Sequence, residues 1–402
     1  RDQVLEYVTN RWGQSRVAMT CTFQHYRRRA AFRETAKVFG YSDEQISKIV
    51  KSGWNPKYID SEILKIQGLA SQIVGKPHFL GQHPGGLLIT NDPIYRHVGL
   101  ERSGGEKDRV ITQIDMHSGI DELGLIKFDI LGNGSLSVLR DALAQVEEQG
   151  LPDPNVTDLD KCYVDFKTIE IIKKGRTRGI FYIESPAQSR LNKKAGVESF
   201  EELTITSSLV RPAGSAYCED FVDRHRKSKM GIKDWEYIHP SLNAILKETH
   251  GILAFQEDVT KVCHIIAGLT YKQADKIRKM MNSLHEGAVE AGEWRSVSEQ
   301  FIDGCIKTSG LIREQAIELW KMVSSFTGFS FCKSHSGSYA QLSFQCAYMK
   351  SHYPAQFLAA VISNNHGFYS RDTYLNEARR LGVRILPVDI NQSRLKYWGK
   401  HD

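Results

Sequence analysis

The residues with the clearest chemical potential lie in GLIKFDILG, residues 124–132, where Lys127 and Asp129 interrupt an apolar run. A carboxylate buried alone is costly, so it normally pairs with a cation, binds a metal or takes up a proton. If the stretch is a strand, its side chains alternate between two faces. One face would carry Leu125, Lys127, Asp129 and Leu131, and the other Ile126, Phe128 and Ile130, which we expect to be core.

Two interpretations of Lys127 and Asp129 are open from these residues alone. Either they form an ion pair at a sheet edge, or Asp129 binds a metal ion while Lys127 faces a phosphate. Mg²⁺ prefers several oxygen ligands and substrate phosphates, so Asp129 would need partners. Asp115, in TQID, is the nearest candidate on a neighbouring strand, or else a turn residue. His83, in GQHPGG, is a phosphate or primer contact, or else a loop histidine.

A second group of candidates is cationic. The predicted helix YRRRAAFR carries Arg27, Arg28, Arg29 and Arg33, and guanidinium groups this close together repel one another unless an anion is near. They form either a solvated surface or a contact to the phosphates of a nucleic-acid backbone.

Further cationic candidates lie in the second half of the chain. Arg278 and Lys279 fall on a predicted helix, and Arg211 precedes a proline, which favours an extended or turn conformation. FCKSHSGS is predicted to be a loop that places Lys333, Ser334 and His335 before a helix, where an anion is favoured. That helix is expected to bury one stripe of side chains: Tyr339, Leu342, Cys346, Met349 and Tyr353.

Composition narrows the class of protein. The chain has 402 residues, 41% of them hydrophobic and 25% charged, with a net charge of +6. Seven scattered cysteines without a C-x-x-C pair indicate neither a disulfide framework nor a four-cysteine zinc site, and suit a reducing cytoplasm. There is no apolar run long enough to predict a membrane span and no signal peptide. The start RDQVLEYV lacks an initiator methionine, so we expect residue 1 to lie inside a longer protein.

The pattern of elements is mostly helical, with one sheet region. HPGGLLIT, RVITQID and GLIKFDIL read as strands between turn residues, and Ser42–Gln45 and Thr270–Gln273 read as capping boxes. Residues 157–366 are mostly helical, and the last dozen residues are loop-like. Helices are predicted at 2–12, 25–40, 60–76, 135–148 and 372–382, and further strands at 17–23 and at VRILP, 383–387.

These residues contain no Walker loop, no Rossmann fingerprint and no paired nucleophile and base. By themselves they indicate a phosphate-handling protein that binds nucleic acid. In order, GQHPGGLLI, TQIDM, LIKFDILGNGSLSVL, GIFYIESPA, RPAG, HPSLNAILKETHGILAFQEDV, AGLTYKQADKIRKMM and KSHSGSYAQLSFQCAYMKSHYPAQFLAAVIS resemble the alpha subunit of bacterial DNA polymerase III. This is the C family of DNA polymerases, here of the DnaE type, and the resemblance covers nearly the whole chain.

The resemblance implies an α+β, mostly helical fold. It comprises a nucleotidyltransferase-like palm similar to that of polymerase beta, an inserted helical thumb and a large helical fingers domain. The implied segments are palm at 1–23 and 81–134, thumb at 24–80, fingers at 135–385, and the start of a linker or helix-hairpin-helix region at 386–402.

The resemblance also implies a reaction. In this family three aspartates hold two Mg²⁺ ions roughly 3.5–4 Å apart, and a primer 3′-hydroxyl attacks the alpha phosphate of a dNTP. Asp129 matches the third aspartate, and Lys127 fits charge neutralisation beside it. The other two aspartates would precede residue 1, so we expect the fragment alone to hold Mg²⁺ poorly and to synthesise nothing.

The remaining implied roles are binding roles in a cytoplasmic DNA replication enzyme. The arginines of YRRRAAFR would hold primer–template DNA, and clamp and replisome contacts would lie outside this chain. Gln82, Pro84 and Lys279 depart from the family pattern, and Lys279 lacks the bidentate fork of an arginine. The alternatives are a DNA-binding fragment without catalysis and an error-prone, translesion accessory polymerase; a hydrolytic nuclease has little support. Nucleotide or phosphate contacts would come from His83, Arg211, Arg278, Lys279, Lys333, Ser334 and His335.

Overall fold

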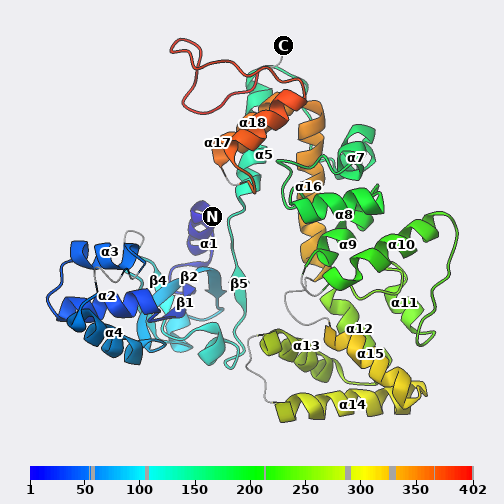
Figure 1. The fold of residues 1–402 in the computed structure, drawn as a ribbon, viewed down its shortest axis with the longest axis horizontal. Coiled ribbons are helices and arrows are strands. Elements are labelled where there is room, and N and C mark those ends of the chain that lie inside the picture. Colours follow the sequence, from blue (N-terminus) through cyan, green and yellow to red (C-terminus); the bar gives the residue numbers. More distant parts are fainter. Residues whose placement is uncertain are drawn as a thin grey trace. The chain divides into compact units, whose positions relative to one another are not determined.

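A computed structural model describes the chain in two compact units, Arg1–Gly132 and Asn133–Asp402 (Figure 1). It is mostly helical with one small mixed sheet, which confirms the α+β prediction. None of the helices it describes is both long and apolar enough to cross a membrane. The structure describes all residues except 54, 56–58, 105–107, 212–213, 286–290, 326–331, 366 and 401–402.

The first unit is built on a five-stranded sheet with the order β3-β4-β1-β2-β5. Neighbours β1 and β2, β2 and β5, and β3 and β4 are antiparallel, whereas β1 and β4 are parallel. The order makes β5 an edge strand next to β2. The strands are β1 (Val17–His25), β2 (Pro77–Ile89), β3 (Leu100–Arg102), β4 (Val110–Thr112) and β5 (Lys127–Asp129).

Alternation along β1 and β2 gives the sheet two apolar faces. Helix α1 (Asp2–Trp12) contributes Leu5 to a cluster with Met19 and Leu87, and the opposite face carries Ala18 and Leu88. The second cluster is completed by a 3₁₀ turn, η2 (Ile94–Arg96), and by η3 (Met116–Ile120), whose ends contribute Ile94 and Ile120.

The core face predicted for residues 124–132 is wrong for Ile126 and Phe128, whereas Ile130 is partly buried against the cluster that contains Leu87. Ile126 is 69% exposed and Phe128 46% exposed, whereas the Lys127 side chain is only 12% exposed. The reason is the position of β5 at the sheet edge, where one face of a three-residue strand receives no apolar cover. On the polar face, the Lys127 side chain is shielded while Asp129 stays 44% exposed.

Three helices form an insert between β1 and β2 with a small core around Phe32, Ile46 and Ile66. The capping box at Ser42 is confirmed, because Ser42 and Gln45 exchange side-chain hydrogen bonds with each other's backbone N–H. The sheet extends further into this region than predicted, since His25 still pairs with Pro77. The helices are therefore shorter than expected: α2 (Arg28–Val38), α3 (Asp43–Lys51) and α4 (Ser61–Ile73).

The second unit is helical and has two apolar cores. The first gathers around α16 and α17, and the second lies among α11 to α15. A short 3₁₀ turn, η4 (Ser215–Tyr217), precedes α10. The helices are α5 (Gly134–Glu148), α6 (Leu159–Val164), α7 (Phe166–Lys173), α8 (Pro186–Ala195), α9 (Phe200–Leu209), α10 (Cys218–Lys229), α11 (Leu242–Leu246), α12 (Gln256–Ile265), α13 (Tyr271–His285), α14 (Ala291–Ser309), α15 (Arg313–Ser325), α16 (Lys333–His352), α17 (Pro354–Asn364) and α18 (Arg371–Arg380).

Two predictions in this unit are wrong. The segment after Cys332 is not a loop, because α16 begins at Lys333; Ser336, one turn on, is buried against Ser208 of α9 with 2.7 Å between their hydroxyl oxygens. VRILP, residues 383–387, lies among the described residues and forms no strand. The buried stripe on α16 is confirmed for Leu342, Cys346 and Met349, while Tyr339 and Tyr353 are partly buried.

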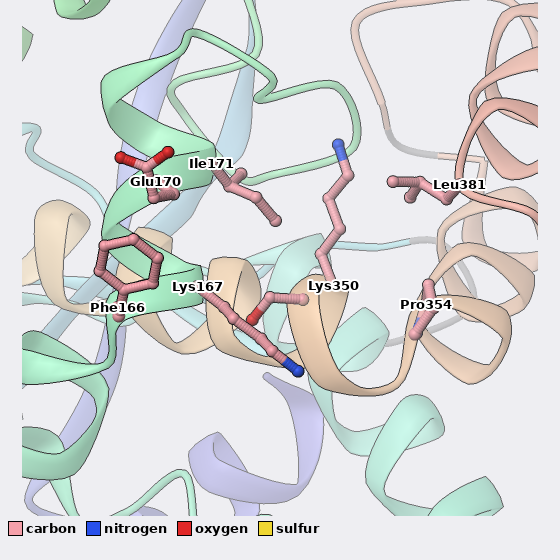
Figure 2. Close-up of a pocket in the computed structure, with 8 residues that line it drawn as sticks. Phe166, Lys167, Glu170, Ile171, Lys350, Pro354 and Leu381 are labelled. Carbon is pink, nitrogen blue, oxygen red and sulfur yellow. The ribbon is translucent and has the colours of Figure 1, made fainter.

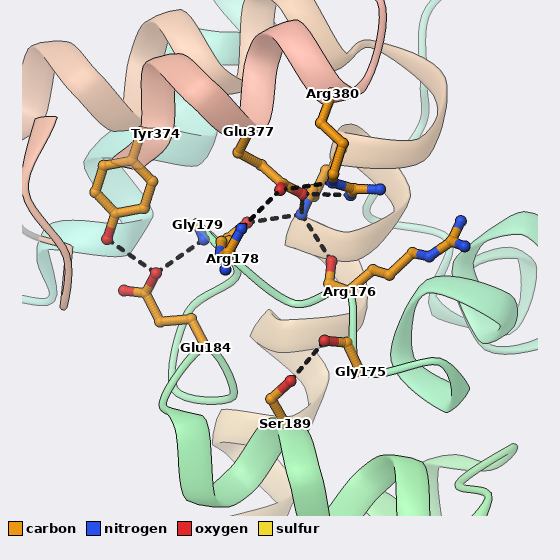
Figure 3. Close-up of polar contacts among 10 residues, drawn as sticks. Gly175, Arg176, Arg178, Gly179, Glu184, Ser189, Tyr374, Glu377 and Arg380 are labelled. Atoms are coloured by element: carbon orange, nitrogen blue, oxygen red, sulfur yellow. Dashed lines mark hydrogen bonds and ion pairs between the residues drawn. The ribbon is translucent and has the colours of Figure 1, made fainter. Parts of the chain in front are cut away.

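A buried ion pair joins α16 to α18 (Figure 3). Lys350 Nζ donates to Glu377 Oε1 at 2.7 Å and to the carbonyls of Arg176 and Arg178 at 2.7 and 2.8 Å. All three ammonium donors are therefore used, although burial lowers the pKa of Lys350 to about 8. Arg380 completes the pair by donating to both oxygens of Glu377. The ammonium thereby fixes the segment that follows α7.

Replacing Lys350 tests this pair. Lys350→Met removes the fully buried cation of the Glu377 carboxylate, leaving only the arginine contacts, and it leaves the carbonyls of Arg176 and Arg178 without their donor. We therefore expect the free energy of unfolding of the second unit to fall by about 3–5 kcal/mol. Urea denaturation measures it. Arg313→Met, which breaks a half-exposed pair with Glu299, is the matched control and should cost less than about 1 kcal/mol. Equal losses in both variants would contradict this role for Lys350.

Candidate functional site

The first candidate site lies where β5 pairs with β2. Asp129 is opposite Gly86 and Lys127 is opposite Leu88 in the antiparallel register. Because alternate residues share a face, Lys127 and Asp129 lie side by side, with 3.1 Å between Nζ and Oδ1. The Asp129 side chain is 44% exposed, so one carboxylate at the end of the strand remains accessible to a ligand.

His83 joins this pair at an irregularity of β2, where the register with β1 shifts between the pairs Met19–Leu87 and Cys21–Gln82. Its Nδ1 accepts the backbone N–H groups of Gly85 and Gly86 at 3.1 and 2.5 Å. It also lies 3.8 Å from Asp129 Oδ1. Burial and the nearby Lys127 lower the pKa of His83, against the opposing effect of Asp129. An Nδ1 that accepts hydrogen bonds carries no proton, so His83 is a neutral imidazole whose Nε2–H is the available donor.

Gly86 is the residue that permits this close approach. A Cβ at Gly86 would lie 2.2 Å from Thr20 Oγ1, 2.8 Å from His83 Nδ1 and 3.0 Å from Lys127 Cδ. Because real Cβ atoms do not make such contacts, any side chain here would displace neighbours on both adjoining strands.

The prediction that Asp115 lies on a strand neighbouring Asp129 is wrong. Asp115 follows the end of β4, and β1 and β2 separate β4 from β5 in the sheet. With about 4.8 Å between adjacent strands, the two residues are too far apart to share a metal ion. Within the part of the chain that the structure describes, no group of three His, Cys, Asp or Glu side chains could hold a metal ion.

The arginines of the helical insert divide into two kinds. Arg33 is held inside the insert, since it donates to Asp43 at 2.9 Å and to Ser47 at 3.3 Å. The other three are exposed at the start of α2 and form no ion pair with an acidic residue in the described ranges; they are Arg27, Arg28 and Arg29. These three remain available to a polyanion.

In the second unit, Arg211 and His335 come together around two tyrosines. Arg211 donates to the Tyr182 hydroxyl at 3.2 Å, and its guanidinium lies 5.4 Å from the centre of the Tyr182 ring. Tyr339 contacts Tyr182 edge to face, and His335 lies 4.2 Å from Tyr339 between ring centroids. Burial and the nearby Arg211 lower the pKa of His335. The cluster therefore combines one permanent cation with a histidine held toward its neutral form.

Segment 175–184 positions Tyr182 in this cluster. The Lys350–Glu377 pair holds the carbonyls of Arg176 and Arg178, and Glu184 accepts the Gly179 N–H at 2.8 Å and the Tyr374 hydroxyl at 2.9 Å (Figure 3). Tyr182 itself has a positive φ of 66°, a conformation that costs energy for an aromatic residue and persists because both sides are held.

The other cationic candidates surround the first turn of α12. Arg278 donates to Asp275 through Nε and Nη2, and Lys279 Nζ lies 3.3 Å from the same carboxylate. Although burial alone would raise the pKa of Asp275, hydrogen bonds from Arg278 and Lys279 lower it. Arg278 also reaches Gln256, the first residue of α12, at 3.4 Å.

Lys333 contacts the same turn from α16. Its backbone N–H donates to both oxygens of Glu257 at 3.2 and 3.0 Å, and its ammonium pairs with Glu248. The first N–H of α16 thus already faces a carboxylate. In the next residue, the hydroxyl oxygen of Ser334 lies 3.3 Å from Cys332 Sγ. The predicted anion position at this helix start is held by Glu257 in the structure.

Sequence reasoning missed the residues that hold these cations in place. Glu257, Asp275 and Tyr182 appeared only as members of longer motifs, without a role of their own. One usable signal existed for Glu257: acidic residues favour the first turn of a helix, and QEDV opens α12 with two of them. No local pattern indicates that Tyr182 would meet Arg211, because that contact depends on packing.

A pocket of about 330 Å³ lies elsewhere in this unit, between α7 and the start of α17 (Figure 2). Lys350 contributes to its wall, but the ammonium is committed to the buried pair. None of the predicted site residues lines this pocket, whose lining consists of Phe166, Lys167, Glu170, Ile171, Lys350, Ser351, Pro354 and Leu381.

In comparison with known proteins, both units match models of one class of DNA polymerase subunit. Residues 1–132 match the model "Bacterial DNA polymerase III alpha NTPase domain", and residues 135–309 match "Bacterial DNA polymerase III alpha subunit finger domain". The boundary between the two models falls where the two compact units divide. The chain is therefore related, through both units, to the bacterial DNA polymerase III alpha subunit.

Individual relatives agree with these matches. The DNA polymerase III subunit alpha of Campylobacter jejuni is 29% identical over 98% of this chain, which spans 34% of that protein. The Thermus aquaticus subunit is 30% identical over 98% of this chain and 33% of its own length. An error-prone DNA polymerase of Bdellovibrio bacteriovorus is 31% identical over 99% of this chain and 38% of its own length. The chain thus spans about a third of the length of these relatives.

Asp258, next to Glu257, gives this region a pH-dependent stability. Its carboxylate accepts the N–H groups of Ala254 and Phe255, and burial raises its pKa to about 6. The folded state therefore binds a proton between pH 4 and pH 6 that the unfolded chain has released, so this group's contribution to stability falls as pH rises through that window.

Asp258→Asn tests whether this residue's contribution to stability falls as pH rises. The amide keeps an acceptor and cannot ionise, so we expect the variant to be more stable than wild type at pH 7, by up to about 3 kcal/mol, and equal to it near pH 4. Urea denaturation at both pH values measures the difference. Asp160→Asn, an exposed first-turn residue of α6, should show no such dependence. A variant less stable than wild type at pH 7 would overturn the assignment.

Proposed function

We propose that this chain is the palm, thumb and fingers part of a C-family DNA polymerase that adds dNTPs to a primer 3′-hydroxyl under template direction. The observation that carries the proposal is the convergence of His83, Lys127 and Asp129 at one sheet edge, inside the segment that matches the NTPase-domain model. A metal-binding oxygen, a cation and a neutral donor are the groups that a phosphoryl-transfer site needs.

The proposed domains follow the chain's path. Residues 1–23 and 81–134 form the palm, because both supply strands of one sheet. The thumb, residues 24–80, leaves from β1 and returns through β2. Residues 135–385 form the fingers, and 386–402 lead into the next region. The division of the chain at Gly132 supports the boundary between palm and fingers.

In the palm, Asp129 would be one ligand of a two-ion magnesium site. The described residues supply this one carboxylate and no second acid beside it, so they fit a single ligand and not a complete site. When bound, magnesium would offset charge on the phosphates. Lys127 holds the Asp129 carboxylate in place and adds a positive charge beside it. His83 Nε2–H is a donor for a phosphate oxygen or the primer terminus.

In the fingers, the cations bind the triphosphate of the incoming nucleotide. Arg211, Arg278, Lys279 and Lys333 are each held by a partner that a phosphate can replace: a tyrosine hydroxyl for the first, and carboxylates for the others. Half-exposed ion pairs are worth about 0–1 kcal/mol, so exchange for a phosphate is inexpensive. Ser334 and His335 add neutral donors on the first turn of α16.

In the thumb, Arg27, Arg28 and Arg29 grip the phosphates of duplex primer–template DNA. Their exposure and their lack of described acidic partners support this role. Clamp and replisome contacts would be made by other parts of the protein, and the setting is the cytoplasm.

Two narrower alternatives remain within the same family. Relatives named DNA polymerase III subunit alpha and relatives named error-prone DNA polymerase match this chain at similar identity, so either a main replicase or a translesion accessory polymerase fits. The chain by itself acts as a DNA-binding fragment without synthesis, because Asp129 alone does not complete a two-ion site.

The test is Asp129→Asn in the complete gene product, assayed by primer extension. Loss of one magnesium ligand should slow extension by at least about 100-fold, because metal stabilisation of the transition state is worth several kcal/mol. Affinity for primer–template should change little, since the thumb supplies it.

Asp121→Asn is the matched control, as Asp121 is an exposed acid of the same unit a short distance along the chain. It should extend primers at the wild-type rate. Primer extension by Asp129→Asn at nearly the wild-type rate would contradict the proposed polymerase function. Loss of primer–template binding in the same variant would instead indicate a structural role for Asp129.

A further inference from the structure

The base of the helical insert is a two-stranded neck, residues 22–26 paired with residues 75–81. Phe23 is opposite Leu80, and Gln24 is opposite Phe79. Tyr26 closes the neck, because its N–H donates to the Lys76 carbonyl at 2.9 Å and its own carbonyl accepts the Gly75 N–H at 2.8 Å. This backbone ladder fixes the side chains that the neck presents.

The neck presents an ordered row of aromatic rings to solvent. The Tyr26 and His78 rings stack with 4.0 Å between centroids and an interplanar angle of 27°. The Phe79 ring meets His78 edge on at 4.8 Å. Phe79 is nevertheless 56% exposed, at a position fixed by the strand and by its neighbour. An exposed ring that is already positioned can stack on a flat partner at little entropic cost.

The same region carries no negative charge. Residues 17–33 and 63–91 contain no Asp or Glu. At the chain's average of 47 acidic residues in 402, these two stretches would hold about five. Arg27 and Lys76 flank the aromatic row, are exposed, and form no ion pair with an acidic residue among those the structure describes. The neck is therefore positively charged without internal compensation.

We propose that the neck binds single-stranded nucleic acid, with Phe79 stacking on an unpaired base and Arg27 and Lys76 contacting the flanking phosphates. An apolar protein partner would suit the rings but leave the positive charge unpaired. A duplex would supply phosphates, but its base faces are already covered by stacking. An unpaired strand offers a free base face together with phosphates on both sides of it.

This site goes beyond the proposed polymerase function. Gripping duplex DNA by the arginines of α2 requires no free aromatic ring, and binding a single strand requires neither magnesium nor dNTP. The proposal of a single-strand site in the neck and the proposal of polymerase function can therefore be disproved independently.

The experiment uses the whole chain without Mg²⁺ or dNTP and follows fluorescence anisotropy of three labelled probes. These are an oligo-dT, an abasic deoxyribose-phosphate oligomer of equal length, and a closed hairpin duplex without unpaired ends. Phe79→Ala should weaken oligo-dT binding by about 5- to 100-fold, the range for loss of one stacked base. It should change abasic and hairpin binding less than about twofold, and Phe79→Trp should retain oligo-dT affinity.

Two further variants separate stacking from charge and from folding. Tyr95→Ala removes an equally exposed aromatic residue of the same unit and should leave all three affinities unchanged. Lys76→Gln should lower the salt slope by about 0.7 for oligo-dT and the abasic oligomer alike, as expected for one lost phosphate contact. Thermal unfolding of each variant should match that of wild type, because Phe79 lies outside the apolar cores of the unit.

The proposal is overturned if wild type does not bind oligo-dT at low salt, or if Phe79→Ala binds it as wild type does. It is also overturned if Phe79→Ala weakens the abasic and hairpin probes as much as oligo-dT, since the ring would then act through the fold. A chain that passes these tests but belongs to a protein that cannot extend a primer would refute the polymerase proposal and leave this site standing.

Discussion

The close approach of β2 and β5 at Gly86 is the constraint on which the candidate catalytic site depends. With no side chain at Gly86, the strand can pair directly with Asp129 while Thr20, His83 and Lys127 crowd around it. The backbone N–H groups of Gly85 and Gly86 then fix the orientation of the His83 ring. The close backbone approach at Gly86 thus determines the positions of the Thr20, His83 and Lys127 side chains. Leu87 and Leu88, the next two residues of β2, pack into the apolar clusters on opposite faces of the sheet and hold the strand in place.

In the second unit, burial distinguishes the cations that stabilise the fold from those that solvent and ligands can reach. Lys350 is fully buried, uses all its donors and joins helices far apart in sequence. Lys333 and Lys279 are largely exposed and paired with exposed carboxylates. Because breaking a buried pair costs several kcal/mol and breaking an exposed pair costs little, only the exposed cations can exchange partners during a binding cycle. The same residue type therefore supports the fold in one place and, in the proposed function, binds ligand in another.

Sequence alone predicted what depends on neighbours along the chain. The capping boxes at Ser42 and Thr270 and the helix at 2–12 are confirmed, because their hydrogen bonds are local. The extent of β2 was not predictable, since its start at Pro77 depends on pairing with His25. The buried face of β5 was predicted wrongly because alternation does not tell an edge strand from a central one. Sheet order likewise separated Asp115 from Asp129, and no spacing in the sequence indicates that order.

The candidate site shows the same division between local and long-range information. Lys127 beside Asp129 follows from strand alternation, whereas the approach of His83 depends on the register shift in β2 and on the missing side chain at Gly86. The orientation of His83 is therefore the sharpest consequence of the Gly86 constraint, and a nitrogen-15 NMR measurement of its tautomer in the labelled chain at pH 7 tests it most directly. The account predicts a neutral ring with a proton on Nε2 and none on Nδ1, a signal absent from His83→Gln. A proton on Nδ1, or a doubly protonated ring, would contradict it.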